Sequence, residues 1–361
     1  MNKFSRFCFL ISAILCCCCF FIHTEKTPVS AFAKDFNSGS SSEIVMEKTS
    51  NRILYGSNIH EKKYMASTTK ILTAIVIIEN CDLAETVTVS AKTVGVEGSS
   101  IYLEAGEKLS VKDLLYGLML RSGNDCAETL AVHCSGSIEK FAALMNETAE
   151  KIGATESHFV NPHGLHDDNH YTTAYDLALI SCYAMKNATF KEIVSTQKTR
   201  IPFTTRNTER VLINKNKMLK EFEGATGIKT GFTKKAGRCL VSSCERNGME
   251  LISVVLNCGP MFERSKTILQ NGFDEYEMCN LIGSENIIDF IPVENSDTVC
   301  AAYIKNDVIL PLSIDEKNSV EIVYELPETV KSTFAGESEI GLVKIYCLNN
   351  LIFTQKIYTI L

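Results

Sequence analysis

The spacing of apolar residues changes along this chain, and the changes divide it into three parts. The first 33 residues have a positively charged start, an apolar run over residues 7–22 and a small-x-small site at residues 31–33. This order is typical of a signal peptide that is cleaved after Ala33. An uncleaved membrane anchor is the alternative, because 16 apolar residues are short for a membrane span but can serve as one. Either way, we expect the body of the protein to be exported.

The middle part follows a Ser/Gly-rich linker over residues 34–42 and extends over residues 43–278. It begins with two strand-like runs that predict a hairpin and ends with three more. These runs are residues 43–48, 52–56, 227–233, 239–244 and 250–257, and a short strand is also expected over 85–91. Helical patterns lie at residues 71–78, 111–120, 125–133, 138–151, 174–185 and 261–273. We therefore expect one antiparallel sheet, built from both ends of this part, with helices packed on it.

Helix starts are marked by capping sequences at Ser110–Asp113 and Thr173–Asp176. From about Ile282 the pattern changes to short strand-like runs joined by turns, which predicts a small β domain over residues 282–361. The runs are residues 286–293, 299–304, 319–326, 341–346 and 351–360. The fold class is therefore α+β, with two domains after the leading segment.

Composition narrows the possible functions. The net charge is −7 and no basic stripe is present, which argues against a nucleic-acid partner. Five of the 15 cysteines lie in the leading segment, and ten remain. An exported chain with an even number of cysteines invites a disulfide framework, but many of these cysteines lie inside apolar runs, so we expect most to be buried, reduced and hydrophobic in role. No Cys/His spacing resembles a metal site, and no metal or cofactor is expected.

Candidate chemistry begins at Ser67 and Lys70, which share one face of the expected helix. A serine hydroxyl becomes a nucleophile when a base removes its proton, and a lysine can be that base if burial or another cation lowers its pKa. The apolar run that follows supplies the burial. The same spacing recurs at residues 137–140 and 195–198, but the first fits a helix N-cap and the second lies in a polar stretch.

Two further motifs follow in order, Ser122-Gly123-Asn124 at a corner between expected helices and Lys229-Thr230-Gly231 on an expected strand. In this interpretation Ser67 attacks a carbonyl carbon and forms an acyl-enzyme, while Lys70 takes its proton. Ser122 relays that proton to the leaving amine, and Asn124 orients Lys70 and holds the substrate amide. Lys229 places a second cation near Lys70 and lowers its pKa. Each motif alone is common, but the three in this order are not.

The strand motif also predicts how an anionic substrate is held. Three side chains can bind a substrate carboxylate through charge-assisted hydrogen bonds, namely Lys229, Thr230 and Thr233. Gly231 lets a substrate backbone approach the strand closely. The backbone N–H groups of Ser67 and Phe232 are expected to form the oxyanion hole.

With these motifs the sequence resembles the low-molecular-mass penicillin-binding proteins, the serine-type D-alanyl-D-alanine carboxypeptidases of peptidase family S11. The resemblance covers about residues 42–275, with a looser match in the β domain. The stretches that carry it are Tyr64–Ala74, Asn161–Leu165, His170–Leu177, Thr226–Thr233 and Ala236-Gly237.

The resemblance implies a β-lactamase/transpeptidase-like catalytic domain that removes the terminal D-alanine from peptidoglycan stem peptides. It also implies acylation of the same serine by β-lactams, and it requires no cofactor. Lys215 falls where the family often has a basic residue near the carboxylate site. His163 and His170 are interpreted as structural, because the lysine pair already supplies the base. Many members end in an amphipathic helix, whereas this chain ends in a strand-like run, so we expect membrane contact only through an uncleaved leading segment.

Two other functions stay open. A β-lactamase shares the serine and lysine chemistry but needs a fast deacylation base, commonly a glutamate that acts through water. No Glu-x-x-x-Asn stretch of that kind lies between Ser122 and Lys229, and the extra β domain also argues against it. A non-catalytic peptidoglycan-binding protein is the third possibility, and the intact motifs argue against it. Labelled penicillin separates the three, because only a carboxypeptidase should keep a stable covalent adduct.

Overall fold

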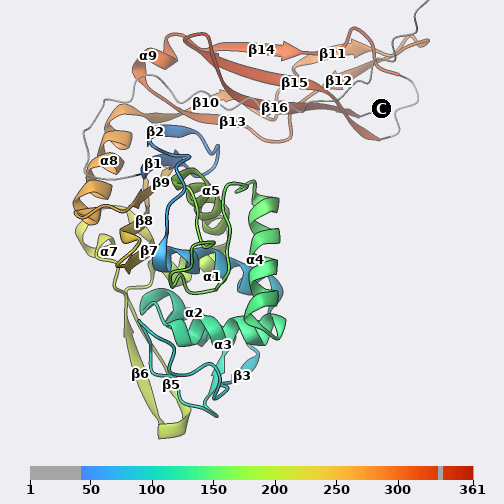
Figure 1. Cartoon of the computed structure of the whole chain (residues 1–361). Coiled ribbons are helices and arrows are strands. Elements are labelled where there is room, and N and C mark those ends of the chain that lie inside the picture. Colours follow the sequence, from blue (N-terminus) through green and yellow to red (C-terminus); the bar gives the residue numbers. More distant parts are fainter. Residues whose placement is uncertain (1–41, 332–335, 361) are drawn as a thin grey trace, which may run out of the picture.

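A five-stranded antiparallel sheet forms the centre of the first part of the computed structural model, which describes residues 42–331 and 336–360 (Figure 1). The strand order is β2-β1-β9-β8-β7. The bounds are Ser42–Glu47 for β1, Ile53–Ser57 for β2, Ala225–Thr233 for β7, Gly237–Arg246 for β8 and Met249–Leu256 for β9. Ile44 of β1 lies opposite Val254 of β9, so strands from both ends of this part meet. The prediction of one such sheet is confirmed.

Helices cover both faces of this sheet. Successive residues of β1 point to opposite faces, because side chains alternate along a strand. Ile44 and Met46 pack into the larger core with α1, whereas Val45 packs on the other face with α8. The helices are α1 (Lys70–Asn80), α2 (Val111–Leu120), α3 (Asn124–Ser135), α4 (Ile138–Ile152), α5 (Ala174–Met185), α6 (Ala188–Ser195), α7 (Met218–Glu221) and α8 (Met261–Glu275).

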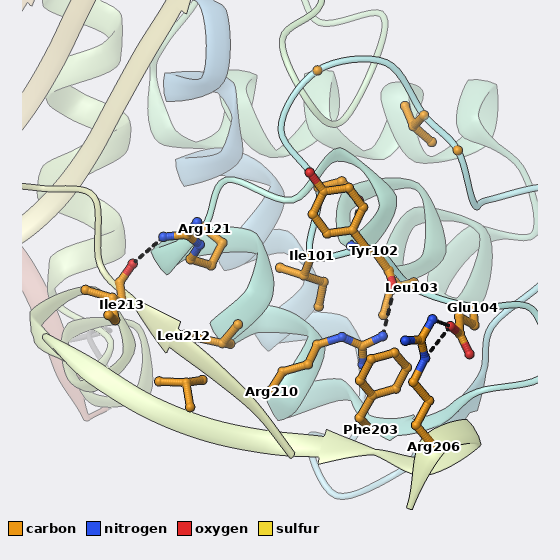
Figure 2. Close-up of a pocket in the computed structure, with 15 residues that line it drawn as sticks. Ile101, Tyr102, Leu103, Glu104, Arg121, Phe203, Arg206, Arg210, Leu212 and Ile213 are labelled. Carbon is orange, nitrogen blue, oxygen red and sulfur yellow. Dashed lines mark hydrogen bonds and ion pairs between the residues drawn. The ribbon is translucent and has the colours of Figure 1, made fainter. Parts of the chain in front are cut away.

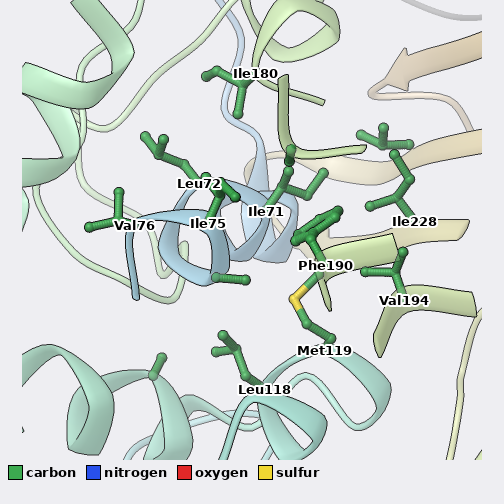
Figure 3. Close-up of a cluster of buried hydrophobic side chains, with 14 of the residues drawn as sticks. Ile71, Leu72, Ile75, Val76, Leu118, Met119, Ile180, Phe190, Val194 and Ile228 are labelled. Carbon is green, nitrogen blue, oxygen red and sulfur yellow. The ribbon is translucent and has the colours of Figure 1, made fainter. Parts of the chain in front are cut away.

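The helix α1 lies in the middle of the larger core and is buried along most of its length. Figure 3 shows Ile71 and Ile75 of α1 among side chains from α2, α5, α6 and β7. Each fully buried side chain of this size contributes about 1.5–3 kcal/mol relative to an exposed one. The burial that the apolar run predicts is therefore present, and it fixes the position of the residues at the start of α1.

Local capping sets several helix ends. Ser110 and Asp113 form the complete capping box at the start of α2. At α5 only half of the predicted box is present, because Thr173 accepts from the Asp176 backbone N–H while the Asp176 carboxylate accepts from Glu156 N and Ser157 Oγ instead. The prediction of a second complete box was wrong, since a tertiary contact takes the carboxylate.

Several short elements differ from the predictions. The strand expected over 85–91 is shorter, because β3 covers only Thr86–Thr88 and pairs with β4 (Lys108–Ser110). A hairpin of β5 (Lys198–Phe203) and β6 (Thr208–Ile213), joined by the 3-10 turn η2 (Thr204–Arg206), lies in a stretch that showed no strand pattern. In Figure 1 this hairpin projects from the helical side of the molecule.

The last part of the chain consists of strands around their own core cluster. They are β10 (Glu277–Ile282), β11 (Asp289–Pro292), β12 (Val299–Ala302), β13 (Val308–Leu312), β14 (Glu321–Glu325), β15 (Glu337–Cys347) and β16 (Asn350–Ile360), with the short helix α9 (Ile314–Lys317). The pairs β10–β13 and β11–β12 form two-stranded sheets, and β14-β15-β16 form a third. The sequence did not predict β10 or β13. The α+β fold class with a strand-rich C-terminal domain is confirmed.

One buried arginine joins the two parts of the chain. The Arg52 guanidinium donates to the Pro311 carbonyl oxygen and forms an ion pair with Glu316 of α9. The predicted signal peptide and most of the predicted linker lie outside the described residues. Across the ranges that the structure does describe, none of the helices is both long and apolar enough to cross a bilayer.

Candidate active site

Ser67 and Lys70 lie at the start of α1 with their reactive atoms facing each other. Ser67 is in a short 3-10 helix, η1 (Ala66–Thr69), that leads directly into α1. The Lys70 side chain is fully buried, and its Nζ lies 3.2 Å from Ser67 Oγ. The same nitrogen donates to Asn124 Oδ1 at 2.7 Å and to the His163 carbonyl oxygen at 2.6 Å. Three contacts from three different segments therefore hold the amine beside the hydroxyl.

The electrostatic surroundings of Lys70 favour its uncharged form. Burial is the main cause that lowers the pKa of Lys70 well below its usual value, and the nearby Lys229 charge lowers it further. Lys215 adds a weaker effect of the same sign, and Asp125 opposes it. A lysine with a lone pair beside a serine hydroxyl has the chemistry of a general base.

The turn that carries Ser67 is held by its own threonines. Thr68 Oγ1 donates to the Met65 carbonyl oxygen at 2.6 Å, and Thr69 Oγ1 donates to that of Ala66 at 2.9 Å. Thr69 Oγ1 also lies 2.7 Å from Nε2 of the buried His170. The hydroxyls of Thr68 and Thr69 are therefore bonded to the backbone of this turn, whereas the hydroxyl of Ser67 faces Lys70.

Ser122 and Asn124 occupy the corner between α2 and α3. Ser122 is buried and has a φ of 64°, a left-handed conformation that permits the sharp change of direction. The Asn124 side chain accepts from Lys70 through Oδ1 and donates to the Glu97 carbonyl oxygen at 2.5 Å through Nδ2. The corner is tied to the preceding loop by the hydrogen bond from Asn124 N to the Ser99 carbonyl oxygen.

The strand β7 brings the third motif to the same place. A Cβ atom on Gly231 would lie 3.0 Å from the Ser67 amide nitrogen, so this strand passes directly beside the nucleophile. Phe232, the next residue, is 63% exposed. The backbone N–H groups of Ser67 and Phe232 thus belong to two adjacent segments, as an oxyanion hole requires.

Lys229 is buried, and its Nζ donates to the Thr230 carbonyl oxygen at 2.8 Å. Burial, with a smaller contribution from the Lys215 charge, lowers the pKa of Lys229 to about 7. Thr233 Oγ1 accepts from Ala236 N at 3.0 Å, which places its side chain at the turn after β7. The structure brings Lys229 close enough to Lys70 for its charge to act on it.

Lys215 lies in the segment that follows β6. Its Nζ donates to Ser99 Oγ at 3.1 Å, and its backbone N–H donates to the Leu120 carbonyl oxygen at 3.1 Å. Burial lowers the pKa of Lys215, and the charge of Arg121 lowers it further. The positive charges of Lys229 and Lys215 therefore both act on Lys70, and the charge of Arg121 acts on Lys215.

A cavity of about 1000 Å³ opens beside Arg121. It lies between the loop over residues 95–104 and the β5–β6 hairpin, and none of the three motifs lines it. Figure 2 shows Tyr102 and Phe203 facing the cavity, with the Arg210 guanidinium above the Phe203 ring at 3.4 Å from its centroid. Arg121 contributes to the same wall and donates to the Ile213 carbonyl oxygen at 3.2 Å. Arg121 directly precedes Ser122, so this residue connects the cavity with the α2–α3 corner.

Some residues that hold the site had no signal in the sequence. The His163 and Glu97 carbonyl oxygens contact Lys70 and Asn124, and a backbone oxygen has no residue type that reveals it. The buried Asp125 carboxylate accepts from three groups of the loop before α2, namely Ser100 Oγ, Ile101 N and Leu103 N. The only sequence feature that pointed to Asp125 was its position directly after Asn124.

The two histidines near the site have lowered pKa values. Burial lowers the pKa of His170 to about 3, and burial also lowers that of His163. His170 Nδ1 accepts from Val160 N at 3.1 Å, so both of its ring nitrogens are engaged with protein groups. These contacts fit a structural role. Among residues 42–331 and 336–360, no group of three or more His, Cys, Asp or Glu side chains has the arrangement of a metal site.

Comparison with known proteins identifies similar sequences and folds. Residues 28–259 match the family model described as D-alanyl-D-alanine carboxypeptidase. The chain is 29% identical over 334 residues to the D-alanyl-D-alanine carboxypeptidase DacF of Bacillus subtilis, which covers 86% of this chain and 84% of that protein.

Solved structures give the same result. Penicillin binding protein 5 from Haemophilus influenzae superimposes with a TM-score of 0.80 at 27% identity, covering 91% of this chain and 98% of that one. A D-alanyl-D-alanine carboxypeptidase from Mycobacterium tuberculosis gives a TM-score of 0.64 at 30% identity, covering 68% of this chain and 95% of that one. The similarity to the former includes the C-terminal strands, since it extends over nearly the whole chain.

Proposed function

Since the chain belongs to the D-alanyl-D-alanine carboxypeptidase family, we propose that it removes the terminal D-alanine from peptidoglycan stem pentapeptides through an acyl-enzyme on Ser67. The observation that carries this proposal is the position of Lys70. Its fully buried Nζ lies between Ser67 Oγ and Asn124 Oδ1, where the charge of Lys229 acts on it. An uncharged amine in this position can take the serine proton.

The proposed reaction begins when Ser67 Oγ attacks the carbonyl carbon of the scissile peptide bond and its proton passes to Lys70 Nζ. The oxyanion of the tetrahedral intermediate accepts hydrogen bonds from the backbone N–H groups of Ser67 and Phe232. The intermediate then collapses, the C–N bond breaks, and Ser122 relays the proton from Lys70 to the leaving amine of D-alanine. Water hydrolyses the acyl-enzyme with Lys70 again as the base, which restores Ser67.

Recognition of the substrate is assigned to the strand β7 and the residues around it. Lys229, Thr230 and Thr233 bind the terminal carboxylate, and Lys215 adds a further positive charge on the same side. Gly231 keeps the strand clear of a side chain where the substrate backbone runs beside Ser67. A β-lactam would acylate Ser67 in the same position, because it presents a carbonyl and a carboxylate to the same groups.

The test is release of D-alanine from a peptide that ends in D-Ala-D-Ala. We expect Ser67→Ala to abolish release, whereas Ser137→Ala and Ser195→Ala, the two other serines with the same spacing to a lysine, retain it. Unchanged release by the Ser67→Ala variant would contradict the proposal. Labelled penicillin adds the second readout: a stable adduct supports a carboxypeptidase, rapid turnover indicates a β-lactamase, and no adduct indicates a binding protein.

We further propose that the protein is exported and cleaved after Ala33, and that it acts at the outer face of the membrane in cell-wall biogenesis and the maintenance of cell shape. The charged and apolar order of residues 1–33 supports this proposal. We place the end of the catalytic domain at about Tyr276, because β10 begins at Glu277 and pairs with β13 of the second domain. The mass of the mature protein from the producing cell tests the cleavage site.

A further inference from the structure

Two half-buried cysteines lie at corresponding ends of two helices of the active site. Cys81 is the C-cap of α1, and Cys134 is in the last turn of α3. Seven of the ten described cysteines are buried, so Cys81, Cys134 and Cys279 are the three that solvent reaches most easily. The helices α1 and α3 pack against each other, and the Cys81 and Cys134 thiols interact with each other, whereas Cys279 Sγ donates to the Glu277 carbonyl oxygen at 3.6 Å.

Neighbouring contacts hold the two cysteine segments together independently of the thiols. His133 Nε2, on the residue before Cys134, lies 3.3 Å from Glu85 Oε2, in the segment that follows Cys81. Both cysteine side chains pack on the edge of the same core cluster as α1 and α3. The backbone ends of the two helices are therefore fixed close to one another.

The environment distinguishes the two thiols. Interaction with Cys81 lowers the pKa of Cys134, although partial burial opposes this effect. The same interaction raises the pKa of Cys81. The thiolate is the form of cysteine that attacks a disulfide, so Cys134 is the nucleophile of the pair and Cys81 is placed to resolve it.

We propose that Cys81 and Cys134 form a reversible disulfide bond that joins the carboxyl end of α1 to that of α3. In the first step, Cys134 Sγ attacks one sulfur of a small-molecule disulfide, forms a mixed disulfide and releases one thiolate. In the second step, Cys81 loses its proton and attacks Cys134 Sγ, which expels the second thiol. The two protein thiols are oxidised, and the external disulfide is reduced to two thiols.

The position of this bond gives it a consequence for the active site. Lys70 opens α1 and Asn124 opens α3, and the Lys70–Asn124 hydrogen bond is one of the contacts that hold the base. The disulfide would close a loop over residues 82–133, which contains Ser122 and Asn124. A cross-link across a loop of this length restricts the unfolded chain and stabilises the folded one. The bond would therefore preserve the arrangement of the two helices under conditions that favour unfolding.

The experiment compares the full chain after treatment with oxidised glutathione and after treatment with dithiothreitol. We expect oxidation to remove two free thiols per molecule, to give a peptide that links Cys81 to Cys134, and to raise the melting temperature by about 5–10 °C. Dithiothreitol should reverse all three changes. Cys81→Ser and Cys134→Ser should each abolish the linked peptide and the stabilisation, whereas Cys279→Ser, the matched half-buried control, should keep both.

Two results would overturn the proposal. One is a stable mixed disulfide of glutathione on Cys134 while Cys81 stays free, and the other is no loss of thiols in the wild-type chain. Both are read from the wild-type protein by mass spectrometry, so neither depends on how well the serine variants fold. The assay for D-alanine release is separate, because the cross-link does not require the proposed reaction.

Discussion

Gly164 lies so close to Ala66 that a Cβ atom on it would stand 1.9 Å from the Ala66 carbonyl oxygen. Ala66 directly precedes the nucleophile, and Gly164 directly follows His163, whose carbonyl oxygen accepts from Lys70. The loop that contains His163 and Gly164 therefore packs directly on the turn that carries Ser67. Gly164 also has a φ of +86°, which other residues rarely adopt.

This contact leads to a prediction for Gly164→Ala. The left-handed conformation alone costs about 1–2 kcal/mol for alanine, but here the methyl group also collides with backbone that cannot move without displacing Ser67. We expect a loss of about 4 kcal/mol or more in unfolding free energy, together with a large loss of acylation by labelled penicillin. Urea denaturation and the acylation rate measure the two effects.

Gly153→Ala is the matched control. Gly153 has a similar φ of +93°, but a Cβ atom there would meet nothing within 4 Å. This variant should lose only the cost of the backbone conformation, and its acylation rate should stay unchanged. Equal losses in the two variants would show that backbone conformation, and not the contact with Ala66, explains the role of Gly164.

Features that depend on neighbouring residues could be predicted from the sequence. The helix α2 covers the residues that its capping box and apolar spacing indicated, and the Asn247-Gly248 pair lies in the turn between β8 and β9. Ser67 and Lys70 were found because a helix brings residues three apart onto one face. The order of the three motifs then indicated which segments should meet, without giving their geometry.

Features that depend on distant contacts could not be predicted. The β5–β6 hairpin is largely exposed and has few buried apolar side chains, so its alternation was too weak to recognise. Part of its anchoring comes from the buried ion pair between Arg210 and Glu107, which are far apart in the sequence. The His163 carbonyl oxygen is a partner of Lys70 from 93 residues away, and nothing in the residue types of that loop indicates it.

The pKa of Lys229 predicts how substrate preference depends on pH. Its ammonium must be charged to bind a carboxylate, and its pKa is about 7, so the charge is lost as the pH rises through 7. We expect the ratio of kcat/KM for a free-acid peptide to that for its C-terminal amide to fall by about 25-fold between pH 6.5 and 8.5. The titration of Lys70 affects cleavage of both peptides equally, so its effect on rate cancels in this ratio.

Two variants check this assignment. Lys229→Arg keeps its charge throughout this range, so the ratio should become independent of pH, whatever the overall loss of rate. Lys229→Ala should give a low ratio at every pH, with the main effect on KM for the free acid. If the wild-type enzyme cleaves the two peptides equally at pH 6.5, Lys229 does not bind the terminal carboxylate.

The buried contact between the two domains predicts the effect of Arg52→Ala. The substitution leaves the Glu316 carboxylate buried without its cation and removes the donor to Pro311. Breaking a buried pair in this way costs about 3–5 kcal/mol, so we expect a marked fall in the stability of the second domain. Acylation by penicillin at low temperature should be unchanged, because Arg52 contacts none of the three motifs.

Limited proteolysis measures the loss of stability in the second domain. In the Arg52→Ala variant we expect the first cleavages to lie beyond residue 276. Lys305→Ala is the control, because it breaks an exposed ion pair with Glu337 within the second domain and should leave the resistance to proteolysis unchanged. Equal resistance of the Arg52→Ala and wild-type chains would mean that the buried pair does not join the domains.

The buried lysines also predict how the stability of the whole catalytic domain depends on pH. Lys229 has a pKa of about 7 when folded and its ordinary value of 10.5 when unfolded, so between these limits the unfolded chain binds one more proton. The unfolding free energy should therefore increase with pH between 7 and 10.5, by up to about 1.4 kcal/mol per pH unit for this residue, and this stability is lost as the pH falls toward 7.

Lys229→Met removes the titrating group, so the unfolding free energy of this variant should rise less steeply between pH 8 and 9.5. Urea denaturation at several pH values gives both slopes, and Lys151→Met, on the exposed face of α4, should keep the wild-type slope. Parallel curves for Lys229→Met and the wild type would mean that this lysine is charged in the folded protein at alkaline pH, and the proposed proton transfer would then lack the dry environment on which it depends.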